Sequence, residues 1–293
     1  PAGPITRVGD ETVDGHPGRT IDGKARHRDP TRSSKTYTAW RYGHTWVVLA
    51  VRVTFPFATR PWALPVRVDL YRDEAANTAR KRPRRTPVQL MCRLLRLRMI
   101  HRPGRTVVFA GDAGFGRHEV ARFCHRHRGR RTRVRKPHPK ANRYDPPAAY
   151  RGRGRPPAKG PRRPKPADAA GPDATRDRLT VGWYGGGKRE VGVVTPAVHG
   201  YQAGNGLVPV RWASVRDRTG THRDEILYTT DPALTPTDII GYDCGRWNIE
   251  ITFQDLRAHL GLETTRGRCE KTVTRAAPCL FGRDSVVAPV DQA

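Results

Sequence analysis

The spacing of apolar residues divides the chain into segments with strand periodicity and segments with helix periodicity. Runs rich in β-branched and aromatic residues predict three strands in series, typical of an antiparallel meander, over residues 5–8, 36–54 and 61–71. Pro65 in the third run indicates an edge or a bulge, because proline has no N–H to donate to a neighbouring strand. The period then changes, and residues 84–101 predict a helix that is capped by Thr86.

A short apolar run that ends in an acid follows this helix. Residues 105–112 predict a strand, a glycine-rich turn comes next, and residues 117–127 predict a helix. Such a β-α unit places Asp112 at the carboxyl end of the strand, where open α/β sheets bind their ligands. Further along, residues 178–231 contain four strand-like runs separated by glycine-rich turns, which predict an all-β insert.

The last predicted element that carries chemistry is one long helix over residues 235–261. Thr235 is suited to cap it with Pro236 in the first turn, and Gly261 is suited to end it in the left-handed conformation. Four polar residues fall on one stripe of this helix: Tyr242, Arg246, Glu250 and Arg257. A carboxylate flanked by arginines is typical either of a metal ligand beside a phosphate-binding surface or of a solvated face with salt bridges.

The charge of the chain favours an anionic partner. Lys plus Arg is 55 and Asp plus Glu is 27, so the net charge is 55 − 27 = +28. Nucleic acid is the commonest partner of so basic a protein, although a GC-rich genome also enriches arginine. Residues 126–166 hold sixteen Lys or Arg and a single acid, Asp145, among many prolines and glycines. This composition predicts a mobile basic arm along a nucleic-acid backbone, or else a solvated linker. Within the arm, we expect three arginines to contact DNA: Arg130, Arg131 and Arg133.

Cysteine usage and hydropathy predict the compartment. The five cysteines show no C-x-x-C spacing, which indicates a reducing compartment rather than a disulfide framework. Cys124 precedes two nearby histidines, but no second ligand pair lies at zinc spacing, so we expect a structural cysteine. The longest apolar run, residues 46–51, is too short to span a membrane, and no signal peptide is visible. We expect a bacterial cytoplasmic, nucleoid-associated protein without membrane contact. Because the chain begins at Pro1 without a methionine, we expect a fragment.

Three acids stand out once the elements are in order. Asp10 and Asp112 come at predicted strand ends, and Glu250 lies on the late helix. Three strands, a helix, a strand and a final helix are typical of a ribonuclease-H-like α/β core, a mixed sheet flanked by helices, in which the first and fourth strands are neighbours. Three converging carboxylates would bind two Mg²⁺ (or Mn²⁺) ions, because hard cations prefer oxygen ligands and unneutralised acids repel one another.

Three motifs carry a resemblance to a known family. Gly9-Asp10-Glu11-Thr12, the run FAGDAGFG that contains Asp112, and Gly245-Arg246-Trp247-Asn248-Ile249-Glu250 with Arg257 resemble the signatures of DDE transposases of the IS4-like kind. The third motif is similar to that group's Tyr-x2-Arg-x3-Glu-x6-Lys signature, and the resemblance covers nearly the whole chain.

The resemblance implies a ribonuclease-H-like fold with an all-β subdomain inserted between the second Asp and the Glu. It implies that Asp10, Asp112 and Glu250 form the metal-binding catalytic triad. Arg246 and Arg257 would contact DNA phosphates, and Tyr242 is the nearest candidate for the signature tyrosine. The implied partner is double-stranded DNA, at element ends and at the target, bound by a homodimer. The implied reaction is phosphodiester hydrolysis followed by 3′-OH strand transfer.

The chain departs from the signature in ways that leave alternatives open. The signature tyrosine is expected at position 243, which is Asp, while Tyr242 stands one place early; Arg257 replaces a lysine. The DNA-binding helices expected before the core and the apolar helices expected after it are missing from the sequence. The alternatives are therefore a truncated, catalytically inactive remnant that only binds DNA and a ribonuclease-H-like nuclease without strand transfer.

The expected domain organisation follows these motifs. We expect the first part of the core over residues 1–125, the basic arm over 126–177, the β-rich insertion over 178–233, and the C-terminal helices of the core over 234–293.

Overall fold

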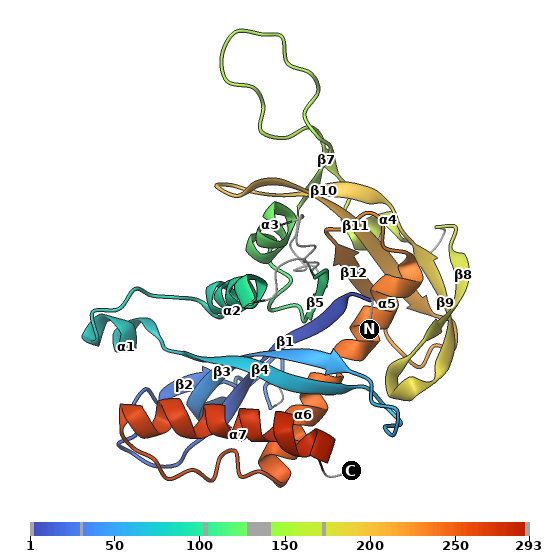
Figure 1. The fold of residues 1–293 in the computed structure, drawn as a ribbon. Coiled ribbons are helices and arrows are strands. Elements are labelled where there is room, and N and C mark those ends of the chain that lie inside the picture. Colours follow the sequence, from blue (N-terminus) through green and yellow to red (C-terminus); the bar gives the residue numbers. More distant parts are fainter. Residues whose placement is uncertain (1–2, 30–31, 102–104, 128–141, 172–173, 291–293) are drawn as a thin grey trace. The chain divides into compact units, whose positions relative to one another are not determined.

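The computed structural model describes residues 3–29, 32–101, 105–127, 142–171 and 174–290 (Figure 1). The chain has a mixed α/β fold with two sheets and divides into two compact units. Unit 1 consists of Pro1–Arg7 and Arg102–Trp247, and unit 2 consists of Val8–His101 and Asn248–Ala293. Each unit therefore combines segments that are distant in sequence.

The sheet of unit 2 is built around one long central strand, β3 (Trp40–Val53). It pairs antiparallel with β2 (Ala25–Arg28) through its first residues and with β4 (Trp62–Tyr71) through the rest. On its other side it neighbours β1 (Ile5–Gly15), whose residues from Val8 onward belong to this unit. The β3–β4 register shifts between Leu49 and Ala50, opposite Pro65, which confirms the predicted bulge.

Helices cover this sheet on both sides. Among the described residues, four helices belong to unit 2: α1 (Glu74–Ala79), α2 (Pro87–His101), α6 (Asn248–Ala258) and α7 (Glu270–Val290). Every residue of β3 from 43 to 50 is buried, as expected for a strand covered on both faces, and Figure 1 shows α2 and α7 on opposite sides of β3 and β4. α2 begins at the predicted cap, because the Gln89 N–H donates to Thr86 Oγ1 at 3.2 Å. The ring of Phe281 from α7 lies 6.3 Å from that of Trp46.

Unit 1 contains the predicted strand–turn–helix and the predicted β-rich segment. The first is formed by β5 (Val107–Gly111) and α3 (His118–Arg126). A seven-stranded antiparallel sheet follows, with the order β7-β6-β10-β11-β9-β8 and β12 beside β11. Its strands are β6 (Arg143–Tyr144), β7 (Arg162–Arg163), β8 (Asp177–Gly182), β9 (Lys188–Val194), β10 (Ala197–Gln202), β11 (Gly206–Asp217) and β12 (Glu225–Thr229). The two short strands β6 and β7 and the turn α4 (Pro166–Ala169) come from the arginine-rich segment.

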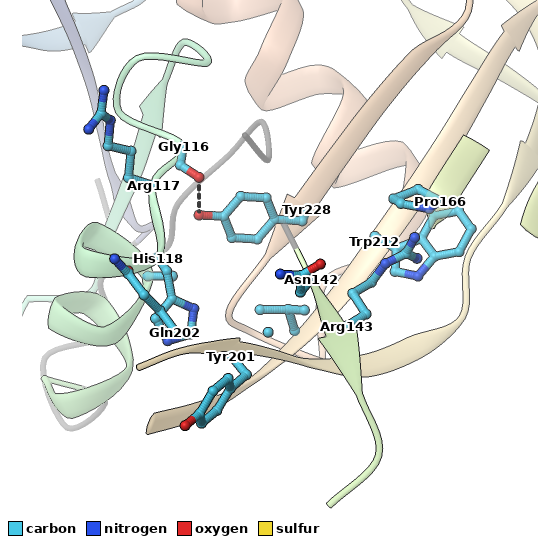
Figure 2. Close-up of a pocket in the computed structure, with 13 residues that line it drawn as sticks. Gly116, Arg117, His118, Asn142, Arg143, Pro166, Tyr201, Gln202, Trp212 and Tyr228 are labelled. Carbon is cyan, nitrogen blue, oxygen red and sulfur yellow. Dashed lines mark hydrogen bonds between the residues drawn. The ribbon is translucent and has the colours of Figure 1, made fainter. Parts of the chain in front are cut away.

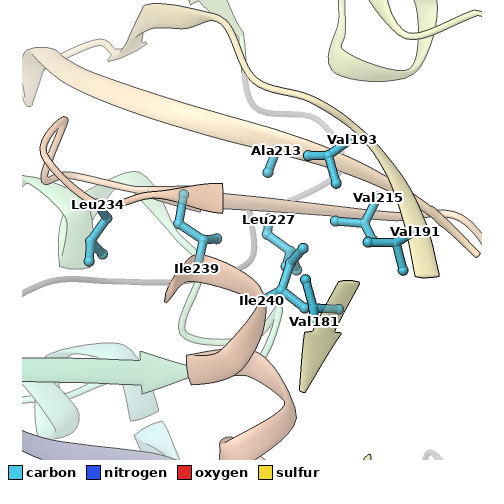
Figure 3. Close-up of a cluster of buried hydrophobic side chains, with 9 residues drawn as sticks. All are labelled: Val181, Val191, Val193, Ala213, Val215, Leu227, Leu234, Ile239 and Ile240. Carbon is cyan, nitrogen blue, oxygen red and sulfur yellow. The ribbon is translucent and has the colours of Figure 1, made fainter. Parts of the chain in front are cut away.

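One apolar cluster holds a helix against this sheet. α5 (Pro236–Arg246) contributes Ile239 and Ile240, which are 0% and 1% exposed. They pack with side chains of β8, β9, β11 and β12 (Figure 3), namely Val181, Val191, Val193, Ala213, Val215 and Leu227, and with Leu234. Burying aliphatic side chains is the main favourable term in folding, so this cluster fixes α5 on the sheet.

The prediction of a single helix over residues 235–261 is wrong in one respect: α5 and α6 are separate helices that meet at Trp247. The Trp247 N–H bonds to the Cys244 carbonyl, three residues back, which tightens and ends the first helix. Gly241 and Gly245 weaken the helix just before the break, since glycine is a poor helix former. The predicted ends are confirmed. Thr235 forms a capping box at the start, and Gly261 has a φ of +76° just beyond the final turn.

The structure bears on the predictions about disulfides and membrane spans. All five cysteines are free, and Cys124 is buried in α3. Among the described helices, none combines the length and the apolar character needed to cross a membrane.

A half-buried acid on α7 makes the stability of the protein depend on pH. Burial raises the pKa of Asp284 to about 6, and the nearby carboxylate of Asp255 adds to the rise. The charged form is disfavoured in the folded state, so this group lowers the stability as pH rises from about 4 through 6.

We predict that Asp284→Asn stabilises the protein at pH 8 by roughly 1–2 kcal/mol, a figure that allows for partial exposure, and has little effect at pH 4. Thermal unfolding at both pH values measures this. The exposed Glu74→Gln serves as the control. Equal effects of Asp284→Asn at the two pH values would contradict the prediction.

Candidate functional site

The first predicted acid lies on β1, within unit 2, but the prediction that Asp10 ends a strand is wrong, because β1 continues to Gly15 and Asp10 lies in its middle. Side chains alternate along a strand, so Asp10, Thr12 and Asp14 share one face. Asp10 is half-buried and its Oδ1 accepts the Glu11 N–H at 2.8 Å, while Thr12 and Asp14 are buried. This face of β1 is therefore polar but lies inside the unit.

Helix α6 packs on β4, where Thr252 Oγ1 donates to the Ala63 carbonyl at 2.8 Å, and it reaches β1 through one side chain. The Arg257 guanidinium donates a hydrogen bond to Thr12 Oγ1, two residues beyond Asp10. Glu250 lies in the first turn of α6, seven residues before Arg257, and two helical turns bring both side chains to one side of the helix. Asp10 and Glu250 thus belong to two elements of unit 2 that are joined through Arg257.

The carboxylate of Glu263, a residue with a strained backbone, holds Arg257 in place. Glu263 has a φ of +80°, a left-handed conformation that is unfavourable for a residue with a Cβ. Its Oε1 accepts the Arg257 Nε–H at 2.8 Å and its Oε2 accepts from Arg41 Nη2 at 2.5 Å. The two arginines offset the cost of the backbone conformation, because hydrogen bonds between charged groups are stronger than neutral ones.

The second predicted acid lies in unit 1, directly after β5. Asp112 is half-buried, and its Oδ1 accepts the Phe115 N–H at 3.2 Å, which closes the turn into α3. A Cβ at Gly114 would lie 3.1 Å from that oxygen, so the glycine leaves room for the carboxylate. Residues 113–114 are exposed, and this strand-end acid has a solvent-facing turn beside it.

The polar residues of α5 are less exposed than a solvated stripe would require. Arg246 is 3% exposed, with its guanidinium 5.4 Å from the ring centre of Trp247, and Tyr242 packs against the apolar cluster of α5. Asp243, at the position of the signature tyrosine, is 1% exposed and accepts a hydrogen bond from Tyr184 Oη at 3.0 Å. A phenol from the β8–β9 connection therefore contacts position 243, which no sequence pattern had indicated. The predicted DNA contacts Arg130, Arg131 and Arg133 lie outside the described residues.

Unit 1 also contains a pocket of about 360 Å³ that sequence analysis missed (Figure 2). Its walls come from α3, β6, β10, β11 and β12. Tyr228 Oη donates to the Gly116 carbonyl at 3.3 Å, and burial raises the pKa of this phenol. His118 Nε2 lies 2.9 Å from the Gly206 carbonyl, and burial lowers the pKa of His118. Both side chains are thus expected to be neutral near pH 7.

A buried cation is the main polar group of this pocket. Arg143 is 5% exposed, and its guanidinium lies 4.8 Å from the ring centre of Trp212. Its Nε and Nη2 have no hydrogen-bond partner among the described residues. Burial lowers the pKa of Arg143 to about 10, an effect that Asp168 opposes. The pocket therefore offers unused N–H donors to an anionic or carbonyl-bearing group. The only sequence signal was an arginine beside Tyr144 in a segment otherwise typical of a linker.

The model of the transposase DDE domain matches residues 74–277, which is well over half of the chain. The chain belongs to the transposase DDE domain family. The match includes Asp112 and Glu250 but begins after Asp10. A search of curated proteins found no match.

Membership of the transposase DDE domain family indicates a transposase function and a DNA substrate, and this family generally uses divalent metal ions. The chemistry of the predicted donors fits such ions. Asp10, Asp112 and Glu250 are carboxylates, the hard oxygen ligands that Mg²⁺ and Mn²⁺ prefer, and all three are half-buried.

We predict that Arg143→Met raises the melting temperature of the protein, by the equivalent of about 1 kcal/mol or more. A thioether side chain of similar length keeps the packing on Trp212 without the burial of a charge that lacks full pairing. Thermal unfolding of this variant, with the exposed Arg178→Met as control, measures the effect. A lower melting temperature for Arg143→Met alone would show that the guanidinium stabilises the fold.

Proposed function

We propose that this chain is a DNA transposase catalytic domain that hydrolyses a phosphodiester at the end of an insertion element and joins the freed 3′-OH to target DNA. The observation that carries the proposal is the match to the transposase DDE domain over residues 74–277. A finer assignment to the IS4-like group is supported by the Arg246, Glu250 and Arg257 spacing.

The strand order supports a ribonuclease-H-like core. β4, β3, β1 and β5 follow one another in the first sheet, so the first strand and the strand that ends in Asp112 are neighbours in that order. Within unit 1, the Ile5 N–H donates to the Thr106 carbonyl at 2.8 Å. On this proposal residues 178–233 form the inserted β-rich subdomain, and residues 1–125 and 234–293 supply the core.

We assign the metal-holding role to Asp10, Asp112 and Glu250, with two Mg²⁺ or Mn²⁺ ions. Bound ions of this kind activate a water or a 3′-hydroxyl and stabilise the leaving oxygen of a phosphodiester. The residues of the chain would hold the three carboxylates in position for these ions. The Phe115 N–H orients Asp112, and the Arg257–Thr12 hydrogen bond links α6 to β1.

The arginines divide into two roles under this proposal. Arg246 is 3% exposed, so we assign it to positioning at the junction of α5 and α6, next to Tyr242. Arg257 has a side chain that is 34% exposed and keeps donor capacity near the proposed site, which suits a DNA phosphate. The arginine-rich segment 126–177, with Arg130, Arg131 and Arg133, would contact the DNA backbone without reading its sequence.

The net charge of +28 agrees with this use of DNA as an extended anionic partner. We further propose that a homodimer assembles on DNA, so that two element ends can be processed together. Work on chromosomal DNA would place the protein in the bacterial cytoplasm, associated with the nucleoid.

The test uses purified full chain with intact and nicked duplex DNA in Mg²⁺ or Mn²⁺. We predict metal-dependent cleavage, and we predict that Asp10→Asn, Asp112→Asn and Glu250→Gln each reduce its rate by at least about 100-fold, because each removes a charged ligand oxygen. DNA binding, followed by fluorescence anisotropy, should keep its affinity and its salt dependence in all three variants.

The exposed Asp177→Asn is the matched control and should cleave like the unaltered chain. Cleavage that survives any triad variant would contradict the assignment of that residue. Salt-sensitive binding without any cleavage by the unaltered chain would favour a DNA-binding remnant, the alternative left open by the aspartate at the signature tyrosine position. Cleavage without joining of the 3′-OH to a second duplex would favour a nuclease.

A further inference from the structure

A second group of potential ligands lies beyond Asp10 on the same strand face. Asp14, His16 and His44 are 1%, 6% and 1% exposed, and all belong to unit 2. One potential ligand atom from each lies within 4.8 Å of the other two. Donors about 2 Å from a shared ion are separated by up to about 4 Å, so a small side-chain shift would close this group on a cation.

One oxygen of the Asp14 carboxylate lacks a hydrogen-bond partner among the described residues. Asp14 Oδ2 accepts from His16 Nε2 at 3.0 Å, whereas Oδ1 has no hydrogen-bond partner among the described residues. A buried carboxylate oxygen without a partner is costly, because its hydration is lost and nothing replaces it. The unsatisfied Oδ1 is an observation independent of the clustering, and it indicates a missing positively charged ligand.

One of the two imidazoles, that of His44, is held in an orientation that suits metal binding. His44 Nε2 donates to the Asp22 carbonyl at 2.8 Å, so the lone pair of the neutral ring is on Nδ1. A histidine that binds a metal typically donates its other N–H to a carbonyl or carboxylate in this manner. The ring centres of His16 and His44 are 5.0 Å apart, in an edge-to-face arrangement that leaves the two rings unstacked.

The backbone brings the three residues together before any ion binds. The His16 N–H donates to the Tyr42 carbonyl at 3.0 Å, which fixes the end of β1 beside β3. A Cβ on Gly43 would lie 2.0 Å from the Asp14 carbonyl oxygen, so only glycine permits this approach of the strands. The site is thus built by the fold and not by flexible side chains on a surface.

We propose that Asp14, His16 and His44 form a zinc-class metal site, separate from the carboxylate triad. Two imidazole nitrogens and one carboxylate oxygen form a donor set typical of Zn²⁺, with a water as fourth ligand, whereas Mg²⁺ prefers oxygen donors alone. Asp10 and Asp14 are four residues apart, or about 13 Å along a strand, so one ion cannot be shared by the two sites. The ion fastens the end of β1 to β3 and neutralises the buried Asp14.

The test uses the full chain, stripped of metal with a chelator and then titrated with Co²⁺ as a spectroscopic probe. We expect one Co²⁺ per chain with the visible absorption of a four-coordinate N/O site, displaced by Zn²⁺ but not by Mg²⁺. Zn²⁺ at about 100 times its dissociation constant should raise the melting temperature by about 5 °C. Asp14→Asn and His16→Gln should each weaken binding by at least about 100-fold.

Two controls keep the outcome interpretable. His259→Gln removes an exposed histidine of the same unit and should bind like the unaltered chain, and Asp10→Asn should also retain Zn²⁺. If the ligand variants fail to fold, NMR of the unaltered chain should show two histidine side chains shifted by Zn²⁺. Three results would overturn the proposal: no saturable binding of Co²⁺ or Zn²⁺, full binding by His16→Gln, or sulfur-to-cobalt charge-transfer bands that assign the metal to the cysteines. None of these depends on DNA cleavage, so the transposase proposal is tested separately.

Discussion

The hydrogen bond between Arg257 of α6 and Thr12 of β1 links the helix that carries Glu250 to the strand that carries Asp10. It connects a helix from the end of the chain to the first strand, at a position two residues beyond Asp10. The bond depends in turn on Glu263, whose left-handed backbone is tolerated because two arginines converge on its carboxylate. Strain of this kind is usually retained only where the surrounding contacts over-determine it.

In a protein with so large an excess of cationic side chains, most of the described carboxylates have basic neighbours. Several carboxylates are tied to arginines inside a unit, as Asp22 is to Arg80 and Asp217 is to Arg189. Burial alone would raise the pKa of Asp217, but hydrogen bonds from Thr219, Thr221 and His222 outweigh it and lower the pKa below its usual range. Asp14 differs from these acids, since it contacts a histidine in place of an arginine and one of its oxygens has no partner among the described residues.

The sequence predicted well those features that arise from local physics. Runs rich in β-branched and aromatic residues located β3 and β4, the Pro65 bulge followed from the missing N–H, and the caps at Thr86 and Thr235 followed from their side-chain oxygens. The break at Trp247 was missed because the stripe of polar residues outweighed the two glycines of α5. The Arg143 pocket was missed for another reason. Its walls come from strands and a helix that are distant in sequence, and no periodicity reports which of them meet.

Sequence periodicity does not report which distant segments meet, and for this reason the triad could be predicted from the sequence whereas the Asp14 cluster could not. Asp112 is marked by its place after an apolar strand, and Glu250 by arginines at helical spacing. Asp14 and His16 are marked by nothing, because an acid and a histidine two residues apart are common on polar strands. They become potential metal ligands only together with His44. Strand β3 brings His44 alongside them because Gly43 allows the two backbones to approach. A metal site made by strand pairing is therefore visible only after folding, whereas acids at element ends can be inferred before it.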